Sequence, residues 1–495
     1  MTERSGKKLK LGRIRERYQT LSVQAKASLW FLICAFLQKG ISFITTPIFT
    51  RIMSTDEYGR FGVFYSWLGI VSVFVTFNLC YGVYSQGLVK FSKDRPVFSS
   101  SMQGLVLTLT CTYTVIYLIF HDFFNTLFNL STVQMLAMMI LIWTSAAFNF
   151  WAEEQRVEFK YKAIIVFSLI LAIVKPALGV VLVIHSDDKV TARILAIVAV
   201  EMALGTVLFA MQMRHGRVFC NGHYWAYGLR FNIPLIPHYL STTILSSADR
   251  IMIENITSSS DAGIYNLAYS IALIMTLFNS SLLQTLSPWI YQKIKAKKIR
   301  DIGRVAYSTL IFIAAVNLLL ILFAPEIVRI FAPPEFASAI WAIPPVIMSV
   351  YFMFSYDLFA KFAFYYERTL FVMLASVLGA GLNVFLNLLA IPRFGFVAAG
   401  YTTLICYMIF AILHYLYMRK VCQDCCDGVM PYRTSVLLRI TVAFLLLGFL
   451  FVLTYWLNFL RYGLIALLLF GGIAFRKKIA EEVRLLIDMK KAPQA

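Results

Sequence analysis

Apolar residues recur along this 495-residue chain in long runs that short polar segments separate. A helix that crosses the hydrocarbon core of a bilayer, roughly 30 Å thick, needs about 20 mainly apolar residues. By this criterion the pattern predicts an all-α integral membrane protein with about 14 transmembrane helices. Their approximate limits are 27–49, 60–83, 103–120, 133–150, 161–184, 190–212, 233–253, 262–290, 305–324, 339–360, 370–391, 398–418, 435–456 and 459–475.

Composition agrees with this class, because 60% of the residues are hydrophobic and only 14% are charged. An ordinary soluble domain has about 45–50% and 25%. The basic tail leads into a full-length apolar run rather than a short one with a small-residue cleavage site. We therefore expect that run to be retained as the first helix. The eight cysteines form no paired framework in the predicted external loops, so we expect reduced thiols.

The net charge of +20 is distributed unevenly over the predicted loops. Of the 45 Lys and Arg residues, 35 fall on the side of the two termini, seven on the opposite side and three within predicted spans. Short loops rich in Lys and Arg remain in the cytoplasm. The charge thus predicts that both termini are cytoplasmic, with membrane lipids and no nucleic acid as partners.

The basic inner segments near 213–230, 292–304 and 419–434 divide the spans into groups of six, six and two. The expected parts are a cytoplasmic tail over 1–26, a six-helix bundle over 27–213, a second over 230–420, two additional helices over 434–475, and a basic tail over 476–495. No predicted loop is long enough to form a separate soluble catalytic domain.

An internal repeat relates the two halves at an offset of 204 residues. The segment 51–66 lies over 255–270 with identities at Ile52/Ile256, Ser54/Ser258, Gly59/Gly263, Tyr65/Tyr269 and Ser66/Ser270, and an acid two residues before each glycine. Internal repeats of this kind are common in transporters. Because both copies join an odd span to the next even one, parallel repeats are expected.

Three segments resemble the polysaccharide transporter branch, which includes the O-antigen flippases, of the multidrug/oligosaccharidyl-lipid/polysaccharide (MOP) flippase superfamily. They are FTRIMSTDEYGRFGVFYSW (49–67), IPLIPHYLSTTILSSADRIMI with DAGIYNLAYS (233–253 and 261–270), and IPRFGFVAAGYTTL (391–404). The resemblance implies two pseudo-symmetric six-helix bundles around a central cavity in the bacterial cytoplasmic (inner) membrane. The implied cargo is a polyprenyl-diphosphate-linked oligosaccharide, a repeat unit of O-antigen, capsule or exopolysaccharide. Polymerase or glycan-assembly proteins are the implied protein partners.

The chain departs from many polysaccharide transporters by the added pair of spans after residue 434. Lipid II flippases of the same superfamily have fourteen spans, so a lipid II-type flippase stays open as an alternative. A multidrug or cation exporter of the superfamily is a further alternative.

Three cations fall inside predicted spans, namely Lys39, Lys175 and Arg250. Each costs about 2.5–3.5 kcal/mol near the bilayer centre, so a function is the default hypothesis. Cations along a transport lumen would replace the hydration of a diphosphate. Alternatively, the lysines reach the interface, and Arg250 pairs with Asp249 or bonds a carbonyl.

Polar neighbours of these cations follow helical spacing. Lys39, Ser42 and Thr46 form one stripe, and His238, Thr242, Ser246 and Arg250 form another. The repeat offset lays Ser42 on Ser246 and Thr46 on Arg250. The stripes are predicted to be two walls of one cavity, or Ser/Thr contacts between helices. Other residues interpreted as cavity-lining are Arg51, Asn383 and Asn387, and the two asparagines equally suit helix packing.

Three acids are candidates for binding a coupling H⁺ or Na⁺ as the cavity alternates, namely Glu201, Asp249 and Asp357. Asp357 and Lys361 have the i, i+4 spacing of a plain ion pair, which we favour there. Glu201 has no evident partner nearby in sequence, so it is the preferred coupling residue.

Other chemistry is disfavoured by the motifs. The sequence contains no Gly-x-x-x-x-Gly-Lys-Ser/Thr phosphate loop, and Cys422, Cys425 and Cys426 do not complete a four-ligand metal set. An integral-membrane polysaccharide polymerase is the alternative from another class, but the predicted outer segments are short. We expect no enzyme activity, no catalytic or metal-binding residues, and no cofactor apart from the coupling ion.

Overall fold

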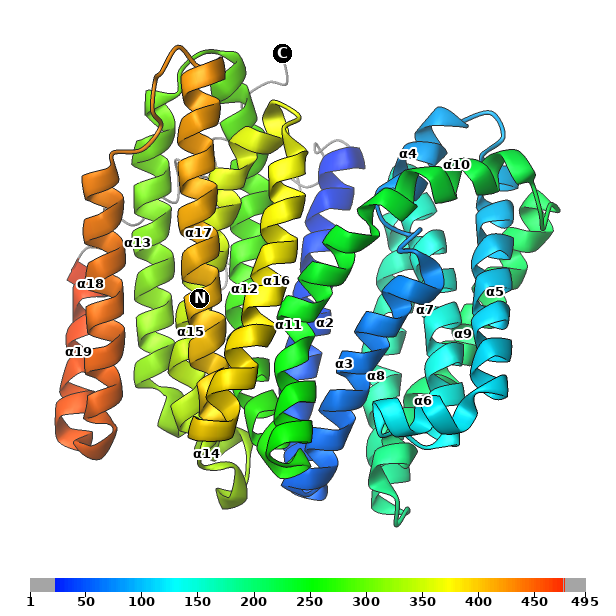
Figure 1. Cartoon of the computed structure of the whole chain (residues 1–495), viewed down its shortest axis with the longest axis horizontal. Coiled ribbons are helices and arrows are strands. Elements are labelled where there is room, and N and C mark those ends of the chain that lie inside the picture. The colour runs from blue at the N-terminus through cyan, green and yellow to red at the C-terminus, as the bar shows by residue number, and fades with distance from the viewer. Residues whose placement is uncertain (1–22, 475, 477–495) are drawn as a thin grey trace, which may run out of the picture. The chain divides into compact units, whose positions relative to one another are not determined.

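A computed structural model describes residues 23–474 and 476, and within these ranges every regular element is a helix (Figure 1). The helices in chain order are α2 (Val23–Ile52), α3 (Thr55–Thr76), α4 (Val83–Lys90), α5 (Arg95–Ile119), α6 (His121–Phe128), α7 (Thr132–Val157), α8 (Tyr161–Ile184), α9 (Lys189–Gly216), α10 (Gly222–Asn232), η1 (Ile233–Leu235), α11 (Ile236–Ile256), α12 (Ser259–Lys295), α13 (Arg300–Leu322), α14 (Ala324–Phe331), η2 (Pro334–Phe336), α15 (Ala339–Tyr365), α16 (Thr369–Phe394), α17 (Val397–Cys425), α18 (Thr434–Leu453), η3 (Thr454–Trp456) and α19 (Asn458–Ala474).

Eleven of the described helices are long and apolar enough to cross a membrane, which confirms an all-helical, multi-pass membrane protein. They lie at the second to sixth and the eighth to thirteenth expected spans. Helices α2, α11 and α19 lie at the three remaining positions and are not among the eleven. In α11 the many Ser and Thr residues, with His238, Asp249 and Arg250, lower the mean hydropathy. Helix α19 has only 17 residues.

The chain divides into two compact units. Of the described residues, unit 1 contains 23–45 and 71–236, and unit 2 contains 46–70, 237–474 and 476. Two boundaries fall inside α2 and α3, and the third falls at the start of α11. The end of α2 and the start of α3 therefore pack with unit 2.

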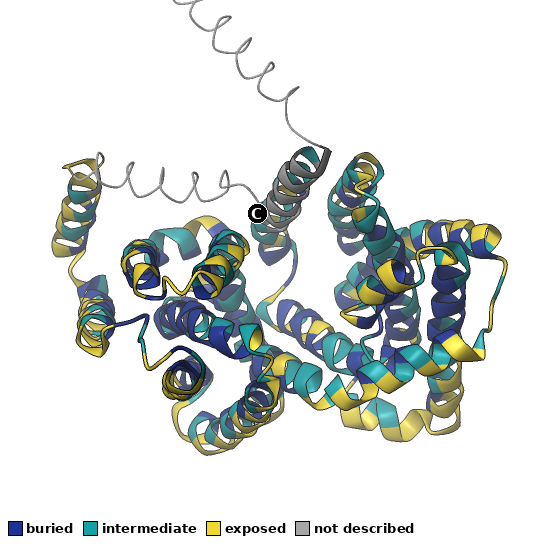
Figure 2. Ribbon diagram, turned by 90° about the horizontal axis from the view of Figure 1, so that it is seen from above, coloured by how far each residue is buried: buried dark blue, intermediate teal, exposed yellow. Residues whose placement is uncertain are grey.

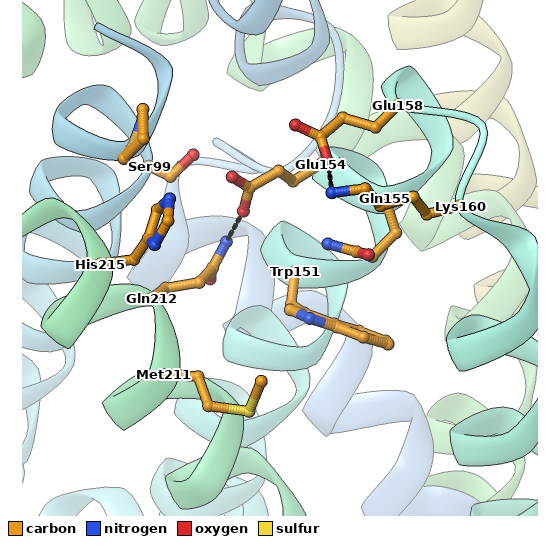
Figure 3. Close-up of a pocket in the computed structure, with 10 residues that line it drawn as sticks. Ser99, Trp151, Glu154, Gln155, Glu158, Lys160, Met211, Gln212 and His215 are labelled. Carbon is orange, nitrogen blue, oxygen red and sulfur yellow. Dashed lines mark hydrogen bonds and ion pairs between the residues drawn. The ribbon is translucent and has the colours of Figure 1, made fainter.

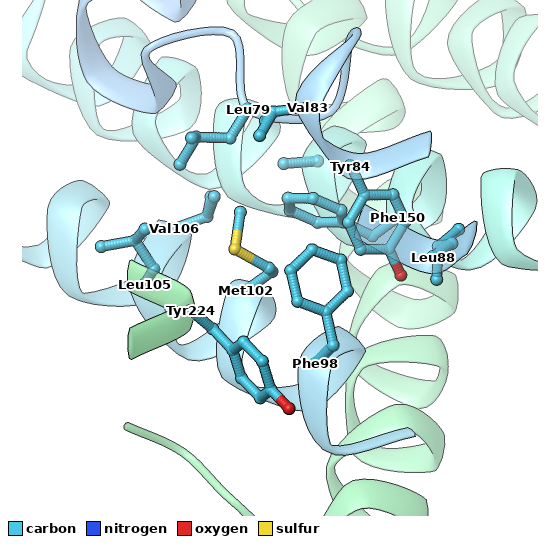
Figure 4. Packing of buried hydrophobic residues seen from close by; sticks show 11 residues of the cluster. Leu79, Val83, Tyr84, Leu88, Phe98, Met102, Leu105, Val106, Phe150 and Tyr224 are labelled. Carbon is cyan, nitrogen blue, oxygen red and sulfur yellow. The ribbon is translucent and has the colours of Figure 1, made fainter. Parts of the chain in front are cut away.

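Unit 1 is built around α7 and α9, which pack against each other and against α5 and α8. A compact aromatic core joins these spans to the short helices α4 and α10 (Figure 4). The ring of Tyr84 lies 4.4 Å from that of Phe150, and its hydroxyl donates to Ser99 Oγ over 2.8 Å. Tyr224 of α10 packs edge-on against Phe98. The two short helices thereby complete one end of unit 1.

Unit 2 is centred on α15, which packs against α12, α13, α14, α16, α17 and α18. In the most apolar 18-residue stretch of α15, 78% is buried. In the corresponding stretch of α18 and η3, the buried share is 22%. Buried faces meet between the helices of each unit, and exposed residues mark the faces that no helix covers (Figure 2). Exposed apolar side chains on spans such as α18 are those that lipid would cover.

The repeated segments of the sequence begin two helices in the same way. Ser54 and Ser258 precede α3 and α12, and each hydroxyl accepts a hydrogen bond from the backbone amide three residues on, at 3.2 and 3.0 Å. Such bonds satisfy the free amides of a helix N-terminus.

The two glycines that the repeat matches lie at the crossing of α3 and α12. A Cβ on Gly59 would lie 1.8 Å from Ser259 O, and one on Gly263 would lie 2.0 Å from Thr55 O. Small residues let two membrane helices approach this closely. The repeat therefore specifies a contact within unit 2.

Candidate functional site

Asp249 lies in the interior of unit 2, on α11, with 3% of its surface exposed. Three neutral side chains donate hydrogen bonds of 2.7 Å to its carboxylate: Tyr265 and Thr403 to Oδ2, and Asn387 to Oδ1. Within residues 23–474, no Lys or Arg forms an ion pair with Asp249. A buried charge normally has a partner of opposite charge. Among the described residues, the carboxylate of Asp249 is therefore bonded by neutral donors and not by a cation.

Further buried polar groups surround Asn387 on α16 and α17. Asn383, one turn before it, accepts a hydrogen bond from Asn387 at 3.4 Å and donates one of 3.2 Å to Thr403. Thr402 donates to the amide oxygen of Asn387. We call Asp249, Tyr265, Asn383, Asn387, Thr402 and Thr403 the Asp249 cluster.

The Asp249 cluster has the chemistry of a site for a small hard cation. Carboxylate, amide carbonyl and hydroxyl oxygens are the ligands that such cations prefer. In a hydrogen-bond network the choice between the oxygen and nitrogen of an Asn amide is an assignment. A rotation of the Asn387 amide would turn its oxygen toward Asp249, and a proton on Asp249 would neutralise the same charge.

Arg250 follows Asp249 in sequence but lies in a different environment. Its Nε donates to Ser66 Oγ and its Nη2 to Ser246 O, both at 2.8 Å. The guanidinium carbon lies 4.5 Å from the centre of the Tyr269 ring, within the range of a cation–π interaction. Two residues of the repeat, Ser66 and Tyr269, thus hold Arg250, which also bonds a carbonyl of its own helix.

In unit 1, Lys175 and Glu201 form an ion pair between α8 and α9. Glu201 Oε2 also accepts a hydrogen bond of 2.6 Å from Ser145 on α7. No partner of Glu201 was evident nearby in sequence, and the structure places one 26 residues away, on the adjacent helix. The structure brings together two residues that were predicted to have separate roles, Lys175 in cargo binding and Glu201 in ion coupling.

The remaining candidate residues lie at separate positions. Asp357 and Lys361 form the expected i, i+4 pair on α15 at 3.6 Å. Arg51 donates to two backbone carbonyls, Pro47 O at 2.7 Å and Ile330 O at 2.8 Å. The side chains of Lys39 and Ser42 lie outside the described part of the chain.

The polar stripe on α11 is engaged mainly by its own helix. Thr242 and Ser246 donate to the carbonyls of Tyr239 and Thr243, at 2.9 and 3.0 Å. The buried Nδ1 of His238 has no hydrogen-bond partner among the described residues. On α2, the carbonyl of Thr46 accepts a bond of 3.1 Å from Thr50.

Sequence reasoning missed Tyr265, Thr402 and Thr403 in the Asp249 cluster, and Ser66 and Tyr269 around Arg250. All five lie in the segments that carry the repeat or the family resemblance. The motifs therefore contained these residues, but they did not show which polar side chains contact one another.

Comparison with known proteins gives a family and a fold. A family model described as polysaccharide biosynthesis protein matches residues 25–294, and a second, described as MatE, matches residues 234–389. The chain is 21% identical over 372 residues to the Lsg locus putative protein 1 of Haemophilus influenzae, covering 71% of this chain and 88% of that one. An uncharacterized membrane protein of the same organism is 22% identical over 370 residues, covering 71% and 87%.

Two solved structures show the same fold at low sequence identity. The lipid II flippase MurJ in an inward closed conformation is similar with a TM-score of 0.70 and 14% identity, over 91% of this chain and 99% of that one. An inward-facing multidrug resistance MATE family transporter is similar with a TM-score of 0.57 and 13% identity, over 80% and 98%. The predictions of an all-helical membrane protein and of the MOP flippase superfamily are confirmed.

The first family model covers more than half of the chain. The chain belongs to the polysaccharide biosynthesis protein family, a polysaccharide transporter family of the MOP flippase superfamily. It is a membrane flippase of that superfamily.

Proposed function

We propose that this member of the family moves a polyprenyl-diphosphate-linked oligosaccharide across the bacterial cytoplasmic membrane by alternating access. The match to the polysaccharide biosynthesis family over residues 25–294 carries the proposal. The fold likeness to a flippase of another lipid-linked sugar supports it. The excess of basic residues on one side supports cytoplasmic termini.

The cargo has an anionic diphosphate and a polar sugar head, which must cross the hydrocarbon while the polyprenyl tail stays in lipid. Cations lower this barrier by replacing the water around the diphosphate. Arg250 is the first residue we assign to this role, with Lys39 and Arg51 as further cations of the pathway. Lys175, the third cation that the sequence suggested for it, is paired with Glu201. Tyr269 and Ser66 fix the guanidinium of Arg250, so little conformational entropy is lost when it binds a phosphate.

The Asp249 cluster binds the coupling cation, H⁺ or Na⁺. Support comes from its uncompensated buried carboxylate and from the amide and hydroxyl oxygens around it. A cation that binds one conformation more tightly than the other shifts the equilibrium between them. The preferred coupling residue is therefore Asp249 rather than Glu201, because Lys175 already balances the charge of Glu201.

The proposed function is tested by export of lipid-linked repeat units in cells whose own flippase is deleted. Arg250→Ala, at the expression level of the wild type, is expected to abolish surface-glycan assembly and leave the lipid-linked units facing the cytoplasm. Lys39→Ala is expected to do the same. Arg439→Ala is the matched control, because the one described hydrogen bond of this exposed arginine of α18 goes to the carbonyl of Ser435. Normal export by both Arg250→Ala and Lys39→Ala would contradict the proposal.

Lipid II is the second candidate cargo. The likeness to MurJ over 91% of the chain and the helix pair α18 and α19 after residue 434 favour it. The two candidate cargoes are distinguished by measuring the rate of flipping in proteoliposomes that contain either lipid II or a polyprenyl-diphosphate-linked repeat unit. Faster flipping of lipid II would assign the chain to that cargo.

A further inference from the structure

A cavity of about 210 Å³ opens at the end of unit 1 that carries the α7–α8 turn (Figure 3). Helices α5, α7 and α9 provide its walls, with the side chains of Ser99, Trp151, Glu154, Gln155, Gln212 and His215. None of these residues has a role in the function proposed above. A space of this size suits a small ligand, on the scale of one sugar ring rather than of an oligosaccharide.

Glu154 is fixed in this cavity by buried amides. Gln212 Nε2 donates to Glu154 Oε2 over 2.5 Å, and Gln103 Nε2 donates to Gln212 Oε1 over 2.6 Å. Gln103 is fully buried, and 5% of Gln212 is exposed. Glu154 lies in the middle of the lining residues, with Ser99 and His215 on one side and Glu158 on the other (Figure 3). The carboxylate is therefore preorganised toward the cavity.

The carboxylate of Glu154 is not held in an ion pair among the described residues. Within residues 23–474, no Lys or Arg forms an ion pair with it, and Gln212 is its one hydrogen-bond donor. Its Oε1 is left to accept bonds from the cavity. A half-buried carboxylate is destabilised when its acceptor positions are not filled by hydrogen-bond donors. Donors from a ligand would therefore be stabilising here.

Glu158, the second acid of the cavity, is compensated. Arg95 contacts it at 3.3 Å and Lys160 at 2.6 Å. Burial raises the pKa of Glu158, but the hydrogen bonds and charges of Lys160 and Arg95 outweigh burial and lower that pKa below its ordinary value. Glu158 is ionised and already engaged, which leaves Glu154 as the acid that can serve a ligand.

The rest of the lining narrows the ligand class. An anion would meet two carboxylates. A small cation would leave the amide of Gln155, the hydroxyl of Ser99 and the imidazole of His215 without a role. A sugar ring uses all of them, because each of its hydroxyls both donates and accepts, and its C–H groups can contact the buried indole of Trp151.

We propose that this cavity binds a single neutral sugar ring, with Glu154 accepting bonds from its hydroxyl groups. The identification of the ring as part of the cargo rests on the proposed function. With cytoplasmic termini, this end of α7 faces the cytoplasm, where lipid-linked sugars are assembled. The cavity then binds a sugar of the cargo head before translocation.

The test is equilibrium binding of free monosaccharides to the full-length protein in lipid nanodiscs, measured by saturation-transfer NMR. The probes are glucose, galactose and N-acetylglucosamine, with ethanolamine as a cation without a ring. At least one neutral sugar is expected to bind. Glu154→Gln is expected to weaken it about tenfold or more, since it removes a charge-assisted hydrogen bond. Glu153→Gln is the matched control, because Glu153 pairs with Arg156 and Ser85 instead of lining the cavity.

A second variant tests the same cavity if Glu154→Gln does not fold. Met211 lines the cavity with half of its surface exposed, so Met211→Trp should fill the cavity and block sugar binding. Binding of ethanolamine alone, binding of no sugar, or equal sugar affinity in Glu154→Gln and the wild type would each overturn the proposal. Monosaccharide binding without transport of lipid-linked sugar would contradict only the proposed function.

Discussion

Two carboxylates, the half-buried Glu201 in unit 1 and the buried Asp249 in unit 2, have different surroundings. Glu201 has a fixed cation, Lys175, and a hydroxyl donor, Ser145. In the described part of the chain, the donors to Asp249 are the neutral side chains of Tyr265, Thr403 and Asn387. Both acids lie in spans or expected spans, where an uncompensated charge costs about 2.5–3.5 kcal/mol.

The difference separates a structural charge from one that can exchange. In unit 1 the protein supplies both charges, so a mobile cation would only compete with Lys175. In unit 2 the donors to the carboxylate are neutral, so a cation bound by this carboxylate would come from solution. Adjacent residues on a helix point about 100° apart, which explains why Arg250 does not fill this position and bonds Ser66 instead.

The largest expected effect is that of Asp249→Asn on cation binding. The variant keeps the shape of the side chain and removes the charge, so we expect at least a 100-fold loss of apparent cation affinity, about 2.7 kcal/mol. Cation-dependent stabilisation measures this, since a ligand present at about 100 times its Kd raises the stability by about 2.7 kcal/mol. The wild type should be stabilised by Na⁺ or by protons, and Asp249→Asn by neither.

Glu201→Gln is the control for that experiment and should retain the cation-dependent stabilisation. If Glu201→Gln loses it while Asp249→Asn keeps it, the roles of the two acids are reversed. A series in Na⁺ at fixed pH, and a second in pH without Na⁺, identifies the cation.

Next in size is the effect of breaking the ion pair of unit 1. Glu201→Gln or Lys175→Met leaves one charge unbalanced in an apolar environment, and each should destabilise the protein by about 2.5–3.5 kcal/mol. The double variant Lys175→Met/Glu201→Met should recover most of that loss, because a buried pair can often be replaced by apolar residues. The wild type, the two single variants and the double variant form a double-mutant cycle, and their unfolding in nanodiscs measures the coupling energy between Lys175 and Glu201. Additive losses would mean that the two side chains do not interact.

Much of the fold could be predicted from the sequence, because the bilayer imposes a length on every span. The eleven confirmed spans correspond to apolar runs. The repeat matched Ser54 with Ser258, and in the structure these residues precede α3 and α12, which begin before the predicted span limits of 60 and 262. The sequence did not show that Gly59 and Gly263 lie at one helix crossing, because a repeat shows equivalence rather than contact.

The candidate site was only partly predictable. Asp249, Asn383 and Asn387 were recognised one by one, because polar residues in apolar helices are rare. Their assembly depends on contacts across 138 residues for Asn387 and 154 residues for Thr403. The pairing of Lys175 with Glu201 likewise depends on the rotation of α8 against α9, which side-chain packing determines. Local spacing contains no information on either.

The smallest expected effect distinguishes the two acids through their threonines. Thr403 donates to Asp249 at 2.7 Å, whereas Thr144 donates to the carbonyl of Ile140 at 2.9 Å and lies 3.4 Å from Glu201. Thr403→Val removes a hydroxyl from the proposed cation site and should weaken cation affinity about tenfold, at the lower end of effects seen around metal sites. Thr144→Val keeps the same change of shape and should leave that affinity unchanged. Equal cation affinities in the two variants would mean that the hydroxyl of Thr403 only packs α17 against α11, and the difference between the two acids would then reside in the carboxylates alone.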